Sequence, residues 1–187
     1  RGRGVGAAGA RGAERAHRLL AMAPPSPHRA WVGLGGNVGD VARTFDAALG
    51  ALGATPGIGG VVASRRFRTR AWGMSDQPDF VNAVAGLETT LEPFALLAVL
   101  QRLERDHGRN RANEQRWGPR TLDLDLLAVE GITLDAPELQ LPHPRLAERA
   151  FVLVPWAELA PWLELPGLGR IADLRDALDR SGVEAIP

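Results

Sequence analysis

The chain has 187 residues, in which 22 Lys+Arg balance 22 Asp+Glu, and it contains no cysteine. This length suits one domain that buries most of its apolar surface without disulfides or metal staples, and zero net charge argues against nucleic acid or an anionic membrane as the main partner. Every basic residue is arginine, which excludes lysine-based phosphate sites and Schiff-base chemistry.

The first 29 residues are expected to form a disordered leader or linker. They are rich in Gly, Ala and Arg and end near the run Ala23–Pro27, a composition that does not build a core. The folded domain is therefore predicted over residues 30–187. No apolar run approaches the ~20 residues that span a bilayer, and the lack of cysteine fits a reducing compartment, so we expect a cytoplasmic protein.

The first half of the domain predicts two strands and a helix. Ala30–Leu34 reads as a strand, and a glycine-rich turn then leads to Asp40, which is placed to cap a helix that runs from Val41 to Gly53. Ile58–Phe67 is apolar and β-branched, as a second strand would be. Residues 68–74 show no periodicity and are predicted to form a loop of the kind that often binds ligands.

The second half predicts further strands and helices. Phe80–Glu88 alternates like a strand, and a helix follows from Pro93 until Gly108. After another strand that starts near Leu122, a turn at 131–137 and a rigid run at 141–144 precede a helix that carries Arg145 and Arg149 at i, i+4. A short helix is expected at 171–178.

The strand near Leu122 carries a pair of aspartates. Because alternate residues of a strand share a face, Asp123 and Asp125 point together while the leucines between them enter a core. Four arginines precede the pair, and two carboxylates beside guanidinium groups are what a Mg²⁺ ion with a polyphosphate needs. The alternative is an edge strand whose polar face is simply solvated.

An aromatic and an amide side chain share a face of the strand 80–88. Phe80 and Asn82 could stack on a flat heterocycle and read its edge. The alternative is that Phe80 lies in the core while Asn82 bonds a loop backbone.

Four motifs give the chain a family resemblance. They are DQPDFVN at 76–82, RWGPRTLDLD at 116–125, LPHPR at 141–145 and RAF at 149–151. From about Trp31 to about Pro161 the chain resembles the 6-hydroxymethyl-7,8-dihydropterin pyrophosphokinases of folate biosynthesis. It departs from their Gly-Ser-Asn at Gly36, which we expect to cost at most a hydroxyl contact, and from the ATP contacts of some members at Glu138 and Gln140.

The resemblance implies transfer of diphosphate from ATP to the pterin hydroxymethyl group, with release of AMP. It implies Asp123 and Asp125 as ligands of two Mg²⁺ ions, and Arg109 and Arg120 as catalytic residues. The implied ATP-binding residues are Gln101, Glu104, Arg111, Trp117, His143 and Arg149. By resemblance, Gln101 and Glu104 meet the adenosine, chiefly its ribose hydroxyls. From the residues alone, this i, i+3 pair is a solvated helix side. The implied pterin-binding residues are Thr69, Trp72, Phe80, Asn82 and Phe151.

The expected fold is α+β, an antiparallel sheet with a ferredoxin-like core and helices on its faces. The expected partners are small molecules, ATP and the pterin, and the expected state is a monomer. Two other classes of function stay open from the residues alone. A nucleotidyl transferase also sets paired aspartates on such a sheet but needs a basic groove, and a non-enzymatic binding module would leave the aspartates merely polar.

Overall fold

The computed structural model describes residues 26–71, 76–109 and 118–186. Its main sheet has the strand order β10-β3-β4-β1-β5, with β2 also paired to β4, and its pairings are antiparallel. The strands are β1 (His28–Gly36), β2 (Ile58–Ala63), β3 (Arg66–Thr69), β4 (Phe80–Thr89), β5 (Asp123–Val129) and β10 (Val183–Ile186).

Two helices connect the strands of this sheet, α2 (Val41–Gly53) between β1 and β2, and α3 (Pro93–Asp106) between β4 and β5. Because β2 and β3 pair with successive parts of β4 and together take one strand position, the chain order is β-α-β-β-α-β with β1 and β4 as the inner strands, which is the ferredoxin-like arrangement. The predicted α+β fold is confirmed. Asp40 caps α2 as expected, since its carboxylate accepts a hydrogen bond from the Arg43 amide at 3.1 Å.

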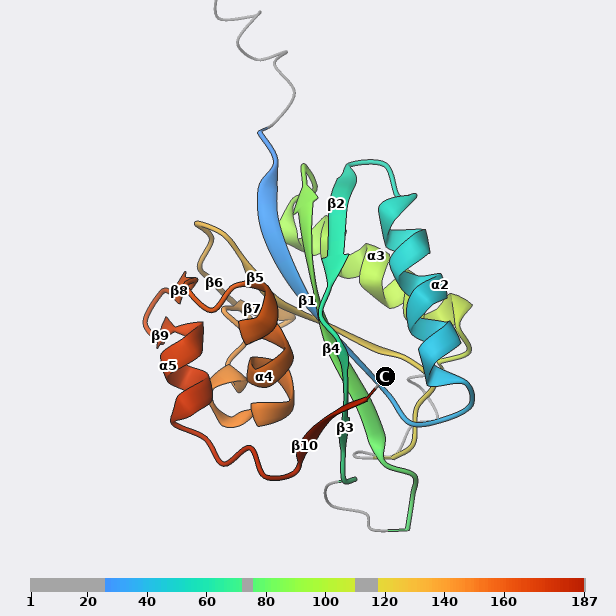
Figure 1. The fold of residues 1–187 in the computed structure, drawn as a ribbon. Coiled ribbons are helices and arrows are strands. Elements are labelled where there is room, and N and C mark those ends of the chain that lie inside the picture. The colour runs from blue at the N-terminus through green and yellow to red at the C-terminus, as the bar shows by residue number, and fades with distance from the viewer. Residues whose placement is uncertain (1–25, 72–75, 110–117, 187) are drawn as a thin grey trace, which may run out of the picture.

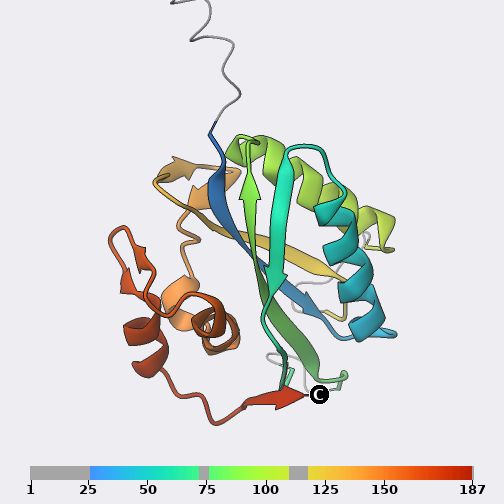
Figure 2. The same cartoon turned by 45° about the horizontal axis from the view of Figure 1, so that its top comes forward.

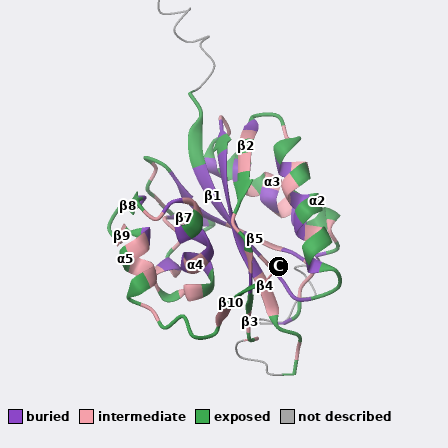
Figure 3. Ribbon diagram, viewed as in Figure 1, coloured by how far each residue is buried: buried purple, intermediate pink, exposed green. Residues whose placement is uncertain are grey.

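The sheet separates two hydrophobic cores (Figures 1 and 2). On one face, side chains of β1, β4 and β5 pack against α2 and α3. On the other face, Trp31, Val84 and Leu127 pack against α4 (Ala150–Leu159) and α5 (Ile171–Asp176). Both faces of the inner strands are thus buried, as Figure 3 shows along the middle of the sheet.

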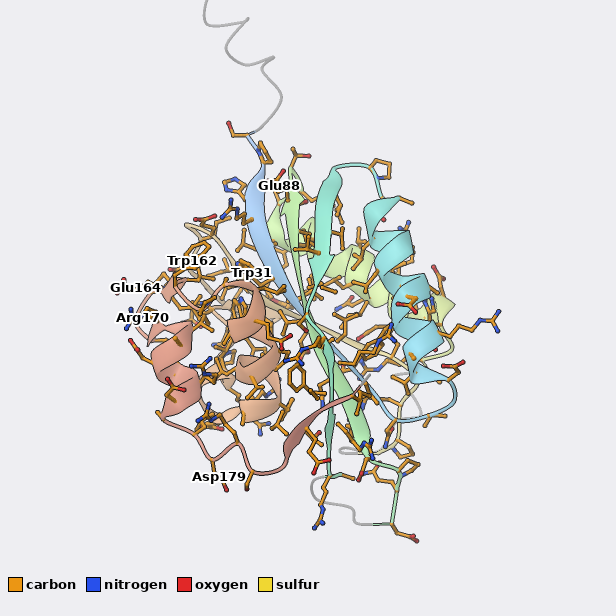
Figure 4. All side chains as sticks on the ribbon, in the orientation of Figure 1. Trp31, Glu88, Trp162, Glu164, Arg170 and Asp179 are labelled. Atoms are coloured by element: carbon orange, nitrogen blue, oxygen red, sulfur yellow. The ribbon has the colours of Figure 1, made fainter. Side chains whose placement is uncertain are left out.

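The second core is centred on two tryptophans. The rings of Trp31 and Trp156 lie 5.7 Å apart between their centroids, and Figure 4 shows Trp31 on the α4 side of the sheet. Trp156 is fully buried, whereas Trp162, just beyond α4, is 57% exposed. This core packs α4 against β4, and Arg149 at the cap of α4 reaches Asp125 of β5.

Short elements complete the C-terminal half. They are β6 (Leu134–Ala136), β7 (Leu139–Leu141), the 3₁₀ turn η2 (Leu146–Glu148), β8 (Glu164–Leu165) and β9 (Gly169–Arg170). The peptide bond between Leu141 and Pro142 is cis. Within the described ranges, the helices all lack the length and apolar character needed to cross a membrane.

The structure corrects two of the predicted elements. Arg68 and Thr69 were expected in a loop, but they belong to β3, because β4 pairs with them on one side and β10 on the other. Arg145 and Arg149 were expected within one helix, but η2 separates them, and Arg149 lies at the cap position of α4. Their side chains therefore point to different partners, Glu148 and Asp125.

The boundary of the predicted leader falls inside a strand. β1 begins at His28, so two residues assigned to the leader are paired with β4. Residues 1–25 lie outside the described residues, and the leader stays a prediction there.

Candidate active site

The two aspartates lie on one face of β5. Leu122, Leu124 and Leu126 are buried on the opposite face, and β5 pairs with β1 so that Asp123 faces Gly35 and Asp125 faces Gly33. The predicted alternation is confirmed. Because β5 ends one side of the sheet, Arg120 from the preceding turn and Arg109 from the segment after α3 reach Asp123 around the sheet edge.

Glycines form the floor beside the aspartates. Gly35 is paired with Asp123 on one side and with Asn82 on the other, so the three residues form a row across β5, β1 and β4. Two strand spacings separate the outer members by about 10 Å. A Cβ at Gly35 would lie 3.6 Å from Asn82 Oδ1 and 3.7 Å from Asp123 Cβ. The amide and the carboxylate therefore border one shallow floor.

Three arginines hold the two carboxylates. Arg109 and Arg120 both donate to Asp123, the latter at 2.8 Å. Arg149 donates to Asp125 at 2.9 Å. The Arg109 side chain is only 6% exposed, while those of Asp123 and Asp125 are 24% and 36% exposed. Of the four arginines that precede the aspartate pair, Arg109 and Arg120 are confirmed beside it, while Arg111 and Arg116 lie outside the described residues.

The charge of Asp123 is held by its neighbours. Burial raises the pKa of this carboxyl, but the guanidinium groups of Arg109 and Arg120 outweigh burial and leave the pKa below its ordinary value. Asp123 is therefore ionised at neutral pH, as a metal ligand must be.

His143 faces the same region with a defined proton. Its amide donates to the Leu127 carbonyl at 2.8 Å, and its Nδ1 accepts from the Arg145 amide at 3.2 Å. In a neutral ring the proton then lies on Nε2, which can donate to an anion. Burial and the charge of Arg149 lower the pKa of His143, against the opposing effect of Asp125. The ring is thus neutral at neutral pH.

The aromatic side of the site lies at the start of β4. Asn82 is buried, and its amide donates to Thr69 Oγ1 at 2.9 Å. The Arg120 guanidinium lies over the Phe80 ring, 5.8 Å from its centroid. The Arg149 guanidinium lies over the ring of Phe151, 5.9 Å from its centroid, and Phe151 is 37% exposed. The alternative in which Asn82 bonds only a loop backbone is wrong, since its partner is a side chain of β3.

The sequence reading missed Asn37, which joins three segments of the site. Its Oδ1 accepts from the Arg120 amide at 2.9 Å, while its Nδ2 donates to Gln77 Oε1 at 3.1 Å and to the Pro78 carbonyl at 3.0 Å. Asn37 is 5% exposed. It ties the turn before β5 to the segment before β4. Its place after Gly35 and Gly36 was the available signal, because a polar residue in a tight turn between site segments is often a bridging one.

Gly36 has a larger role than the sequence indicated. A Cβ at this position would lie 2.7 Å from the Thr121 carbonyl and 3.2 Å from Val41 Cγ1. The turn before β5 therefore approaches the backbone here more closely than any side chain allows. The expectation that the missing hydroxyl costs at most one contact stays a prediction.

Glu104 and Gln101 differ in their surroundings. The interpretation of a solvated helix side is wrong for Glu104, which is 1% exposed and accepts from the Leu124 amide and from Arg109. Gln101 is half-buried on the same helix. The predicted ATP contacts of both residues stay predictions. Arg111, Trp117 and Trp72 lie outside the described residues.

The aspartate pair suits a metal ion whose other ligands are water and substrate oxygens. Among residues 26–71, 76–109 and 118–186, three or more His, Asp or Glu side chains nowhere gather as a metal cage. Mg²⁺ needs no such cage, because one or two carboxylates hold it while water and phosphate oxygens complete its octahedron. Asp123 and Asp125 fit that requirement, with arginines nearby to take the phosphates.

Comparisons with known proteins point to the same chemistry. The family model of 7,8-dihydro-6-hydroxymethylpterin-pyrophosphokinase (HPPK) matches residues 31–161. A 2-amino-4-hydroxy-6-hydroxymethyldihydropteridine pyrophosphokinase of Methylorubrum extorquens is 46% identical over 84% of this chain and 98% of its own length. One of Pseudomonas aeruginosa is 43% identical over 85% and 97%.

Solved structures agree in fold. A crystal structure of a Plasmodium falciparum HPPK-DHPS variant superimposes with a TM-score of 0.64 at 14% sequence identity, over 85% of this chain and 47% of that one. This chain thus spans about half the length of those structures, and at such identity they show the fold alone. The family model and the relatives show the family: this chain belongs to the 7,8-dihydro-6-hydroxymethylpterin pyrophosphokinases.

Proposed function

We propose that this chain transfers diphosphate from ATP to the hydroxymethyl group of 6-hydroxymethyl-7,8-dihydropterin, yielding AMP and the pterin diphosphate ester, a step of folate biosynthesis. The pterin hydroxyl oxygen forms a bond to the β-phosphorus, and the bond from that phosphorus to the oxygen bridging it to the α-phosphate breaks. The hydroxyl proton leaves to solvent. Such transfers depend on placement and charge neutralisation more than on covalent help from the protein.

The observation that carries this proposal is the row Asn82, Gly35 and Asp123 across three adjacent strands. It sets an amide able to read a heterocycle beside a carboxylate able to hold Mg²⁺, with a glycine between them. Two substrates bound at the two ends of this row would meet above Gly35. In-line transfer needs the pterin hydroxyl oxygen and the β-phosphorus of ATP to start about 3–3.5 Å apart, and two substrates that meet above Gly35 can bring these atoms together.

We assign the ATP side of the site to β5 and its neighbours. Asp123 and Asp125 would hold two Mg²⁺ ions, which neutralise charge on the triphosphate. Once metal occupies the carboxylates, Arg109 and Arg120 can turn to phosphate oxygens and stabilise the transition state. The remaining assigned ATP contacts are Gln101, Arg111, Trp117, His143 and Arg149. Glu104 was also expected to contact ATP, but its side chain is 1% exposed and is not assigned a direct contact.

The pterin side is assigned to β3, β4 and the start of α4. Asn82 would bond the edge of the ring, with Thr69 fixing the amide, and Phe80 and Phe151 would cover the two ring faces. Trp72 is the loop contact on this side. We further propose that the protein works in the cytoplasm as a monomer on these two small molecules. Zero net charge argues against nucleic acid as its main partner.

A single incubation tests the reaction. Protein, Mg²⁺, ATP and the hydroxymethylpterin are mixed, and AMP is measured with and without the pterin. AMP that appears only with the pterin supports the proposal. AMP that forms without it would indicate a nucleotidyl transferase or hydrolase, and no turnover at all would favour a binding module.

A further inference from the structure

The C-terminal end of α3 joins Glu104 to Arg109 through the backbone. The Arg109 amide donates to the Glu104 carbonyl at 3.0 Å, and the Gly108 amide donates to the Arg105 carbonyl at 3.0 Å. Gly108 has a φ of 87°. This pairing is the Schellman motif, in which a glycine in the left-handed region closes the helix and turns the next residue back over its last turn. Arg109 is thereby placed above Glu104.

The side chains of the two residues are joined as well. Glu104 Oε1 accepts from Arg109 Nη1 at 2.5 Å and from the Leu124 amide at 2.8 Å. The Leu124 amide belongs to β5, the outer strand next to α3. One carboxylate thus links the helix end, the catalytic arginine and the strand that carries the aspartate pair.

Arg109 lies between two carboxylates that differ in exposure. The side chain of Glu104 is 1% exposed, whereas that of Asp123 is 24% exposed. A ligand can reach Asp123 while Glu104 stays covered. When Asp123 turns to a metal ion, Arg109 loses one of its two carboxylate partners and keeps the other.

We propose, resting on the function proposed above, that Glu104 is a positioning residue that acts on the transfer through Arg109. It anchors the guanidinium from behind, so that the side facing Asp123 remains aimed at the phosphates after Mg²⁺ binds. An arginine that is held in this way loses little side-chain entropy in the transition state. In this role Glu104 needs no contact with the ribose of ATP.

The variant Glu104→Gln isolates the anchor. The glutamine oxygen can still accept from the Leu124 amide, but the charge that holds Arg109 is lost. We expect kcat to fall about 10–100-fold, as is typical when a supporting residue of a site is removed, with KM for ATP changed less than about threefold. Asp106→Asn is the matched control, because it removes an exposed carboxylate from the same helix, and it should leave both constants unchanged.

A double variant separates action through Arg109 from direct binding. Glu104→Gln combined with Arg109→Gln should have the kcat of Arg109→Gln alone, within about threefold, because the anchor has nothing left to hold. The preference of the enzyme for ATP over 2′-deoxy-ATP should be the same in Glu104→Gln as in the wild type. Losses that multiply in the double variant, or a lost preference for ATP, would overturn the proposal in favour of a ribose contact.

A second pair of variants serves if Glu104→Gln does not fold. Among the described residues, a Cβ at Gly108 would meet nothing within 4 Å, so the variants there test the backbone angle. Gly108→Asn tolerates the left-handed region and should keep kcat, whereas Gly108→Val should lower it at unchanged KM for ATP. Equal kcat in both variants would contradict the proposal. An inactive wild type would overturn the proposed function, but an active wild type with unaffected variants would overturn only the role of Glu104.

Discussion

The two aspartates of β5 should differ in their importance for stability while sharing their importance for metal binding. Asp123→Asn removes the carboxylate that pairs with both Arg109 and Arg120 in a largely covered place. Asp125→Asn removes the partner of Arg149 alone, at a carboxylate that is 36% exposed. The same chemical change is thus made two residues apart, in different surroundings.

The expected magnitudes follow from this difference. Removing the largely covered carboxylate that accepts from both Arg109 and Arg120 costs about 1–3 kcal/mol, whereas a solvent-exposed ion pair contributes ~0–1 kcal/mol. For a chain of this size each kcal/mol moves the melting temperature by about 2–4 °C. Asp123→Asn should therefore lower it by about 2–12 °C and Asp125→Asn by at most about 4 °C.

Calorimetry measures both properties on the same samples. Thermal unfolding without ligand gives the stability difference, and titration with ATP in the presence and absence of Mg²⁺ gives the metal-dependent part of nucleotide affinity. Both variants should lose that metal-dependent part. Equal melting temperatures in the two variants, or Mg²⁺-dependent ATP affinity retained in both, would refute the reasoning.

Three further predictions concern the floor of the site, the pterin side and pH. Gly35→Val should fold but lose most of its turnover, since the valine branches enter the space between Asn82 and Asp123. Gly35→Ala makes only ordinary van der Waals contacts and should keep more of the turnover. Melting curves and initial rates check this, and equal rates in the two variants would contradict it. Asn82→Ala should raise KM for the pterin about 5–100-fold, the equivalent of a lost buried hydrogen bond, while KM for ATP stays the same; a change in both constants would argue against separate subsites. Arg109 and Arg120 lower the pKa of Asp123 despite its burial, so the stability difference between wild type and Asp123→Asn should be full above about pH 5 and shrink as the pH falls below about 4. Urea unfolding across this pH range checks the sign, and a stability difference that grows in acid would contradict it.

The sequence allowed prediction of what depends on local pattern. Alternation placed Asp123 and Asp125 on one face of a strand and Phe80 with Asn82 on another, and the structure confirms both strands. Turn and cap signals located α2 and α3 within a residue or two. These features need only the period of strand and helix and the preferences of capping residues.

Features that depend on distant pairing could not be predicted. Arg68 and Thr69 lack a strand pattern of their own, and their place in β3 comes from pairing with β4 on one side and with β10, more than a hundred residues later, on the other. The burial of Glu104 depends on α3 lying over the edge of β5, where the Leu124 amide needs an acceptor. A lone acidic residue on a helix gives no sign of such a partner, and solvation was the natural expectation.

The distribution of phosphorus label between the products tests the central claim most directly. The wild-type protein is incubated with Mg²⁺, the hydroxymethylpterin and ATP labelled separately at the α-, β- or γ-phosphorus. The account predicts that β- and γ-labels appear together and in equal amounts in the pterin product, while the α-label remains in AMP. A pterin product that carries the γ-label alone, with ADP as the other product, would contradict it.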